Sequence, residues 1–309
     1  MFFLCSKKKV RINIKGQVIK KISDFFYVNF EGKIYESKPR GIFKKEKKNI
    51  IVGDFVEITL KDDTTNEAVI ETIYPRKNSL IRPNVANIDN MVVVFAAKEP
   101  LFNYYLADVF LATTENVNIN TILAINKIDL DENQDYLKQE EVYSKIGYKT
   151  VSISAHNNIG IDELKNLLLP GSTVISGPSG VGKSSIINKI IGNSEQKTSK
   201  ISTKLQKGKN TTTYATMIPI EDGKYIVDTP GFTSIKLDNI DKYDLKKCFV
   251  EFEQYDDNCY FGAKCLHDKE PDCSVKDALA EGKIFQSRYD SYLRILSELS
   301  KKDNRRNYK

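Results

Sequence analysis

The stretch GPSGVGKSS, residues 177–185, determines how the rest of the chain is interpreted. It fits the pattern G-x-x-x-x-G-K-[ST] from Gly177 to Ser184, follows the β-rich run STVIS (172–176) and precedes SIINKIIG (185–192), which has helical character. Glycines let backbone N–H groups converge on phosphate oxygens, and the helix N-terminus adds partial positive charge. A glycine-rich turn that arose by chance would not need a strand before it and a helix after it. The predicted phosphate-binding residues are Gly177, Pro178, Ser179, Gly180, Val181, Gly182, Lys183, Ser184 and Ser185.

A second motif, upstream, identifies the base. TILAINKIDL (121–130) ends an apolar strand with Asn126, Lys127, Ile128 and Asp129, the pattern N-K-x-D. An Asp carboxylate can accept from both N1–H and the 2-amino group of guanine, a pair that adenine does not present, and a site built on such pairs rejects analogues that lack them. The Asn amide can donate to N7, and the Lys stem can cover the ring. We therefore predict a guanine nucleotide, GTP or GDP.

Two further segments complete the predicted nucleotide site. Backbone at Ser154 and Ala155, where the next apolar strand ends, could support guanine O6, although a plain strand end is almost as consistent. In YIVDTPG (225–231), Asp228 would hold Mg²⁺ through water and the Gly231 N–H would contact the γ-phosphate. Lys183 would reach the β- and γ-phosphates, and Ser184 would bind Mg²⁺. In KGKNTTT (207–213), Thr212, or otherwise Thr211, would complete the Mg²⁺ ligands.

The order of these motifs along the chain is unusual. Apolar strands at 91–97, 121–125, 149–155, 172–176 and 225–229, with a helix around 102–116, predict a parallel α/β sheet covered on both faces. The guanine motif precedes the phosphate loop, whereas Ras-like GTPases have the phosphate loop first. A circular permutation produces this order without changing the sheet, because domain termini tend to lie close together at the surface.

The N-terminal segment is basic and rich in β-patterned residues. Residues 10–75 read as short strands with turns, which predicts a small barrel of the OB or SH3-like kind, with a loop at 41–54 and a linker at 74–90. Residues 1–50 contain 14 Lys and Arg against 4 Asp and Glu, on a chain whose net charge is +6. This balance suggests a polyanionic partner such as nucleic acid; a solvated lysine-rich surface is the alternative.

A group of cysteines and one histidine follows the predicted sheet. Cys259, Cys265, His267 and Cys273 lie within fifteen residues, a set that suits a closed tetrahedral Zn²⁺ site with a structural role. Disulfides are the competing interpretation, and an intracellular setting argues against them. Cys5 and Cys248 are expected to be ordinary thiols, His156 a loop residue, and 275–302 a helix.

The sequence also limits where the chain can act. No run of about 18 apolar residues occurs, so no membrane span is expected. The opening MFFLCSKKKVRIN places its charges after a very short apolar stretch, which is the wrong order for a secretory signal. We therefore expect a cytoplasmic protein.

Taken with GPSGVGKSS, the threonine triplet, DTPGF, RPNVANID and CYFGAKCLHDKEPDC, the motif order resembles the RsgA family, also called YjeQ or YloQ. These are bacterial GTPases of small ribosomal subunit biogenesis. The resemblance covers essentially the whole chain. It implies an OB-like β-barrel (1–75), a circularly permuted GTPase domain (76–238) and an α-helical zinc-binding domain (239–309). It further implies a monomer that binds the 30S subunit and its 16S rRNA and hydrolyses GTP, stimulated by that subunit, late in its maturation.

Two positions depart from the expected pattern. Asn210 stands where the family usually has a histidine, and Phe232 stands where Ras-like enzymes have a water-orienting Gln. Asn cannot act as a general base near neutral pH, so we predict slow intrinsic turnover that depends on the ribosome. The first zinc spacing is also one residue longer than in many members. A GTP-gated RNA-binding assembly factor with incidental hydrolysis is the alternative function, and a permuted GTPase of the large subunit or of membranes is a weaker third.

Overall fold

The computed structural model describes residues 13–307 except 46–47, 62–64, 82, 193–214, 221–222, 229–236, 238–239 and 257. The described chain forms two compact units. One comprises residues up to Ile88 with short pieces around 215–218 and 227–228, and the other begins at Asp89 and holds most of the remainder. Asn210, Thr211, Thr212, Thr213, Gly231 and Phe232 lie outside the described residues.

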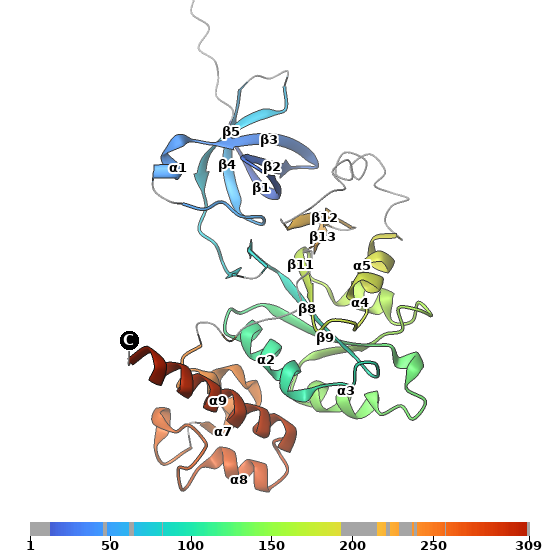
Figure 1. Cartoon of the computed structure of the whole chain (residues 1–309), viewed down its shortest axis with the longest axis vertical. Coiled ribbons are helices and arrows are strands. Elements are labelled where there is room, and N and C mark those ends of the chain that lie inside the picture. Colours follow the sequence, from blue (N-terminus) through green and yellow to red (C-terminus); the bar gives the residue numbers. More distant parts are fainter. Residues whose placement is uncertain are drawn as a thin grey trace, which may run out of the picture. The chain divides into compact units, whose positions relative to one another are not determined.

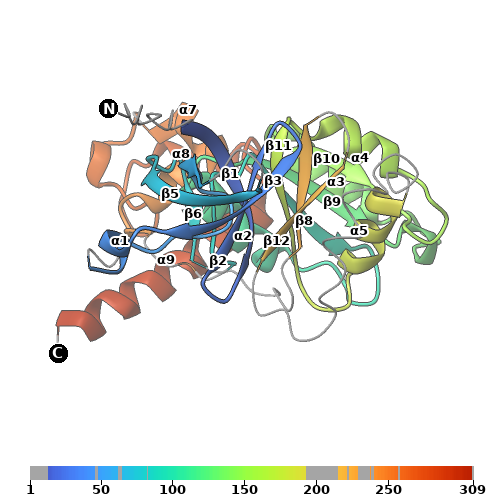
Figure 2. The same ribbon diagram turned by 90° about the horizontal axis from the view of Figure 1, so that it is seen from above.

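The first unit contains a five-stranded barrel, drawn in blue in Figures 1 and 2. Neighbouring strands follow the order β1-β2-β3-β5-β4, and β1 also pairs with β4, which closes the barrel. All pairings in it are antiparallel except β3 with β5. The strand bounds are β1 Asn13–Ile22, β2 Phe25–Phe30, β3 Lys33–Pro39, β4 Phe55–Leu60 and β5 Glu67–Ile73.

The interior of the barrel is filled by alternate strand residues together with side chains from the 41–54 connection. Ile14, Val28 and Ile70 are typical of the strand contribution, and Phe43 and Ile50 come from the connection. The loop prediction for 41–54 was therefore incomplete, because the segment begins with the short helix α1 (Gly41–Lys45). A lysine-rich sequence forms a helical turn here because Phe43 can be buried against the barrel.

The segment predicted as a linker contains secondary structure. It forms a two-stranded hairpin, β6 (Ser79–Leu80) with β7 (Val85–Ala86). The Asn87 side chain donates to the Gly53 carbonyl at 2.9 Å, and the Arg76 guanidinium lies 2.6 Å from the buried Asp54 carboxylate. The polar residues that suggested a linker thus attach residues 74–88 to the barrel through a hydrogen bond and an ion pair. Hydrogen bonds to buried groups cannot be read from composition alone.

The second unit is built on a sheet in the order β10-β9-β8-β11-β13. Strands β9, β8, β11 and β13 are labelled in Figure 1. The pairs β8–β9, β9–β10 and β8–β11 run parallel, and every residue of β8 is buried. The predicted apolar strands are confirmed within a few residues. Their bounds are β8 Asn90–Ala96, β9 Asn120–Asn126, β10 Lys149–Ser152, β11 Gly171–Ser176 and β13 Lys224–Asp228, with β12 at Thr216–Pro219.

Helices cover both faces of this sheet. Val92 and Val94 pack in a core shared with α4 (Ile161–Leu167) and α5 (Lys183–Gly192). Phe95, which points to the other face by strand alternation, contacts Phe110 of α2 (Tyr104–Glu115) at 6.0 Å between ring centroids. Helix α3 (Tyr136–Lys145) packs beside α2 on that face.

The C-terminal part consists of short helices and one long one. They are η2 Leu245–Cys248, η3 Val250–Phe252, α7 Glu253–Asp256, η4 Gly262–Lys264, α8 Ser274–Ala280 and α9 Gln286–Asn307, whose end marks the C-terminus in Figure 2. The single helix predicted over 275–302 was wrong. Gly282 (φ +72°) ends α8, because the Lys283 N–H bonds the Ala278 carbonyl in a Schellman turn.

Helix α2 connects the sheet to the C-terminal part. Val109 and Ala112 of α2 belong to the same buried cluster as Phe249, Tyr292 and Ile295. One face of α2 thus covers the sheet and another covers the C-terminal helices. Among the described helices, none combines the length and apolar character that a bilayer span requires.

Candidate functional site

The phosphate loop connects β11 to α5, as its flanks predicted. Ser179, Gly180, Ser184 and Ser185 are exposed. The Lys183 ammonium donates to the carbonyls of Gly177 (2.8 Å) and Pro178 (2.6 Å), so it folds back across the loop. Burial lowers the pKa of Lys183 below its ordinary value. Incoming phosphate would replace these carbonyl acceptors with negative oxygens, which favour the charged ammonium.

The loop and the guanine motif are joined through one side chain. Asn126, at the end of β9, donates from Nδ2 to the Val181 carbonyl at 2.8 Å, and its Oδ1 accepts from the Ala155 N–H at 3.1 Å. The loop, the N-K-x-D segment and the Ser-Ala pair therefore meet at Asn126. One Nδ2 hydrogen is left for a ligand. The Ala155 N–H, expected to support guanine O6, is directed at Asn126 in this structure.

Gly182 makes this junction possible. Its φ is +93°, and a Cβ added there would lie 2.3 Å from Nδ2 of Asn126. A side chain would therefore strain the backbone and displace Asn126. Gly180, in the same loop with φ +81°, has open space around it: its nearest neighbour is Pro100 Cδ at 3.9 Å.

The rest of the N-K-x-D segment is held by the neighbouring loops. Lys127 adopts φ +63° and its ammonium donates to the Glu99 carbonyl, in the connection between β8 and α2. Residues Ile128–Leu130 form the turn η1. The Asp129 carboxylate accepts from the buried Ser154 hydroxyl through Oδ1. Ser154 thus positions Asp129 through its side chain, a role that the prediction of a backbone contact missed.

A cavity of about 730 Å³ opens beside these residues, a size suited to a nucleotide-sized ligand. Its lining comprises Asn126, Lys127, Asp129, Leu130, Ala155, His156, Gly182, Ser185, Asn188 and Lys189. Leu130, His156, Asn188 and Lys189 were not predicted. Asn188 and Lys189 follow Ser185 by three and four positions, so helical spacing from the phosphate loop could have identified them. His156 is a loop residue, as expected, and also borders the cavity.

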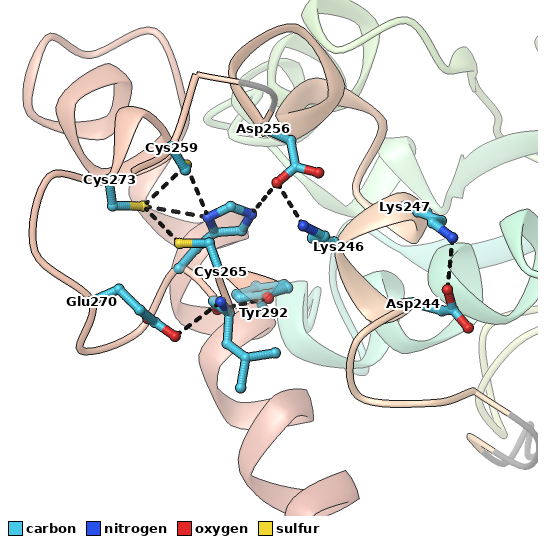
Figure 3. Close-up of polar contacts among 11 residues, drawn as sticks. Asp244, Lys246, Lys247, Asp256, Cys259, Cys265, Glu270, Cys273 and Tyr292 are labelled. Carbon is cyan, nitrogen blue, oxygen red and sulfur yellow. Dashed lines mark hydrogen bonds and ion pairs between the residues drawn. The ribbon is translucent and has the colours of Figure 1, made fainter. Parts of the chain in front are cut away.

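The three cysteine side chains labelled in Figure 3 converge in a second place, together with the side chain of His267. The ligand atoms of Cys259, Cys265, His267 and Cys273 all lie within 4.8 Å of one another, and all four residues are buried. The Sγ atoms of Cys259 and Cys265 each lie 3.8 Å from that of Cys273. Tetrahedral Zn²⁺ with bonds of about 2.3 Å places its sulfur ligands about 3.8 Å apart. The donor set and its spacing therefore fit Zn²⁺.

The surroundings of the cluster hold its loop in place. Burial, with smaller effects from nearby thiols, raises the pKa of Cys265 to about 12, so three adjacent thiolates need a cation to stabilise them. Tyr289 and Tyr292 of α9 donate to the carbonyls of His267 (2.6 Å) and Leu266 (2.8 Å). These contacts attach the metal-binding loop to the long C-terminal helix.

Comparison with known proteins identifies the family. The RsgA GTPase family model matches residues 73–238, which is more than half of the chain, and the RsgA N-terminal domain model matches 15–70. The chain belongs to the RsgA GTPase family. The resemblance and the GTPase assignment made from the sequence are thereby confirmed.

Full-length relatives agree with this assignment. The small ribosomal subunit biogenesis GTPase RsgA of Alkaliphilus metalliredigens is 41% identical over 94% of this chain and 99% of its own length. The crystal structure of YjeQ from Thermotoga maritima superposes with a TM-score of 0.80 at 36% identity, covering 93% of this chain and 99% of that one. YloQ, a circularly permuted GTPase, gives 0.79 at 32% identity, covering 94% and 96%.

The RsgA-type architecture predicted from the sequence is confirmed: an N-terminal barrel, a permuted GTPase domain and a C-terminal part with a Cys₃His cluster. The domain boundaries 1–75, 76–238 and 239–309 remain predictions. Asp228, the proposed Mg²⁺ residue, ends β13. Although its side chain reaches the surface, nearby protein atoms partly desolvate it and raise its pKa. Predictions for Thr212 and Gly231 fall outside the described residues.

Proposed function

We propose that this RsgA-family GTPase hydrolyses GTP during late maturation of the small ribosomal subunit, stimulated by that subunit. The observation that carries the proposal is Asn126, which joins the guanine motif, the Ser-Ala pair and the phosphate loop beside one cavity. The names of the full-length relatives supply the ribosomal role. GTP and GDP are the ligands of this site.

The base-recognition residues have separate roles. Asp129 accepts from N1–H and the 2-amino group of guanine, while Ser154 keeps its carboxylate oriented. The remaining Nδ2 hydrogen of Asn126 donates to N7, and the Lys127 stem covers one face of the ring. Ile128 is the variable position of the N-K-x-D motif and begins the turn η1 that carries Asp129. Backbone at Ser154 and Ala155 borders O6.

The phosphate residues act by position and charge. The loop from Gly177 to Ser185 surrounds the phosphates, and Lys183 turns from the loop carbonyls toward the β- and γ-oxygens. Ser184 and Thr212 are the proposed Mg²⁺ ligands, Asp228 contacts the ion through water, and the Gly231 N–H contacts the γ-phosphate. Bound Mg²⁺ would supply positive charge to the phosphate oxygens. Catalysis then rests on positioning and electrostatics.

The proposed partner of the basic barrel is 16S rRNA in the 30S subunit. Lysine ammonium groups lie over aromatic rings on the barrel: Lys15 over Tyr74 at 4.7 Å and Lys38 over Phe25 at 4.4 Å. Cationic and aromatic side chains together suit the backbone and bases of RNA. In this proposal the protein acts as a cytoplasmic monomer without a membrane partner, and Cys259, Cys265, His267 and Cys273 hold one structural Zn²⁺.

A GTP-gated rRNA-binding factor that needs little catalysis is the second candidate. Asn210 favours it, because an amide cannot take a proton from water near neutral pH. The two functions share binding sites and differ in whether the ribosome accelerates hydrolysis.

The deciding experiment measures steady-state GTP hydrolysis by the protein alone and with 30S, 50S or 70S particles, with ATP as the control nucleotide. The GTPase function is supported if 30S particles stimulate hydrolysis and 50S and 70S particles do not. It further requires that Lys183→Ala abolish this hydrolysis while still binding 30S particles. GTP-dependent 30S binding without stimulation supports the gated binding factor. Absence of both binding and stimulation contradicts both.

A further inference from the structure

His267 presents its two ring nitrogens to different partners. Nδ1 points into the cysteine cluster, 3.3 Å from Sγ of Cys273 and 3.7 Å from Sγ of Cys259. Nε2 points the other way and lies 3.1 Å from Oδ1 of Asp256. Nδ1 is therefore the nitrogen placed to bind a metal, which requires that the proton be on Nε2.

The Nε2 atom is buried, and among the described residues no hydrogen bond of good geometry reaches it. A buried N–H without an acceptor is costly. The Oδ1 atom of Asp256, 3.1 Å from Nε2, is the acceptor within reach. Metal-binding histidines usually donate their second N–H to such a carboxylate, which fixes the tautomer and the ring orientation.

Asp256 is itself held by a buried lysine. The Lys246 ammonium lies 2.8 Å from the same Oδ1, and its side chain is only 5% exposed. Three thiolates and Zn²⁺ carry one net negative charge, which would repel an adjacent bare carboxylate. Lys246 compensates that charge. It also fixes Asp256 from η2, a segment that packs against α2.

We propose that Asp256 is a positioning residue of the metal centre: it accepts the Nε2 proton of His267 so that Nδ1 binds the metal, and Lys246 holds Asp256 in place. The proposal rests on the zinc site of the proposed function and adds two residues to it. Neither residue contacts the metal directly. Both act through His267.

The first test is the rate at which a chromophoric chelator removes zinc from the purified full-length protein. Asp256→Ala is expected to lower zinc affinity by about 10–100-fold, the usual effect of losing such a partner, and so to speed zinc transfer to the chelator. Lys246→Met should also speed zinc release to the chelator. The matched control is Lys247→Met: the neighbouring Lys247 is 72% exposed and pairs with Asp244 at 2.7 Å (Figure 3), and its loss should leave zinc release unchanged.

The second test separates positioning from simple packing. The chain has only two histidines, so ¹⁵N-histidine NMR of the zinc-loaded protein resolves the His267 ring. In the wild type the Nε2 proton should be protected from exchange and shifted downfield by the carboxylate. In Asp256→Ala that proton should shift upfield or exchange with water. Unchanged GDP binding verifies that each variant is folded.

The outcomes distinguish this proposal from the metal site itself. Wild-type protein that binds no zinc overturns both. Zinc-loaded wild type, with the same release rate and the same His267 spectrum in Asp256→Ala, overturns the role of Asp256 alone. Equal effects of Lys246→Met and Lys247→Met overturn the role of Lys246.

Discussion

Arg288 and Asp108 form an ion pair that solvent does not reach: the Nη1 and Oδ1 atoms lie 2.6 Å apart, and both side chains are 0% exposed. Arg288 also bonds both carboxylate oxygens of Glu251, at 2.6 and 2.9 Å, and its guanidinium lies 4.4 Å from the centre of the Phe249 ring. Asp108 belongs to α2 and Arg288 to α9. A single buried cation thus joins the GTPase helices to the C-terminal part.

Arg288→Met should strongly destabilise this unit. Removing one partner of a buried pair leaves uncompensated charge, here two carboxylates, and costs about 3–5 kcal/mol. A fall in the urea midpoint measures the loss. The control is Arg294→Met on the same helix, a residue that is 63% exposed and 3.7 Å from Glu298. Its cost should stay within about 1 kcal/mol, and equal costs for the two variants would contradict the prediction.

Gly182→Ala should impair GDP binding more than Gly180→Ala. Both glycines have positive φ, so both variants carry backbone strain, but only at Gly182 does the new methyl collide with Asn126. We expect the dissociation constants of the two variants to differ by about tenfold or more, since displacing Asn126 should cost upwards of about 1.4 kcal/mol. Fluorescent GDP titration provides the measurement. Equal losses would mean that the Asn126 junction does not govern affinity.

Asp129→Asn should switch the base specificity of the site from guanine to xanthine. The amide oxygen can accept from N1–H while the NH₂ group donates to the 2-oxo group of xanthine, but the amide cannot accept from both N1–H and the 2-amino group of guanine as the carboxylate does. Loss of matched polar groups reduces recognition by about 10⁴-fold or more. Competition between GDP and xanthosine diphosphate tests this, and a variant that still prefers GDP would argue against the role of Asp129.

Cys248 should resist alkylation in the folded protein. Burial, with smaller effects from nearby acidic groups, raises the pKa of its thiol to about 12, and Sγ faces the Asp244 carbonyl at 3.8 Å. The folded state therefore retains the proton. At pH 8 only about one molecule in 10⁴ carries the reactive thiolate. Iodoacetamide labelling read by mass spectrometry should find Cys248 unmodified until urea is added. Ready labelling at pH 8 without urea would show that the thiol is accessible.

Removal of the metal should loosen the Cys259–Cys273 loop while leaving the barrel strands intact. The loop has little regular structure of its own, and a Cys₃His metal would supply its main cross-links. Hydrogen exchange with and without a strong chelator should show protection lost over 258–273 and kept in β1 to β5. Uniform exchange across both regions would instead indicate global unfolding.

The motifs could be read from the sequence because their chemistry is local. Gly177 to Ser184 sit between a strand and a helix, and Asn126 to Asp129 follow a buried strand, as spacing alone predicted. The break at Gly282 was readable in principle, since glycine commonly ends helices. It was missed because the apolar spacing continues across it.

Contacts between distant segments could not be read in this way. Asp108 and Arg288 are 180 positions apart, and an isolated Asp on a helix gives no sign that an arginine will meet it. The same holds for Lys127 and the Glu99 carbonyl, and for Asp256 beside His267. The first pairing depends on the packing of α2 against α9, and the other two depend on how separate loops come together, which local pattern does not specify.

The shared core around α2 has a consequence for biosynthesis. Val109 and Ala112 are synthesised well before Tyr292, Ile295 and Leu299, which belong to the same buried cluster. Until α9 has been synthesised, one apolar side of α2 is exposed to water, and the Asp108 carboxylate lacks the Arg288 guanidinium with which it pairs. The loop that leads into α2 supplies the carbonyl that holds Lys127. In a nascent or truncated chain that lacks α9, the loop that holds Lys127 would therefore lead into a helix with one face unpacked, and we expect such a chain to bind guanine nucleotide more weakly.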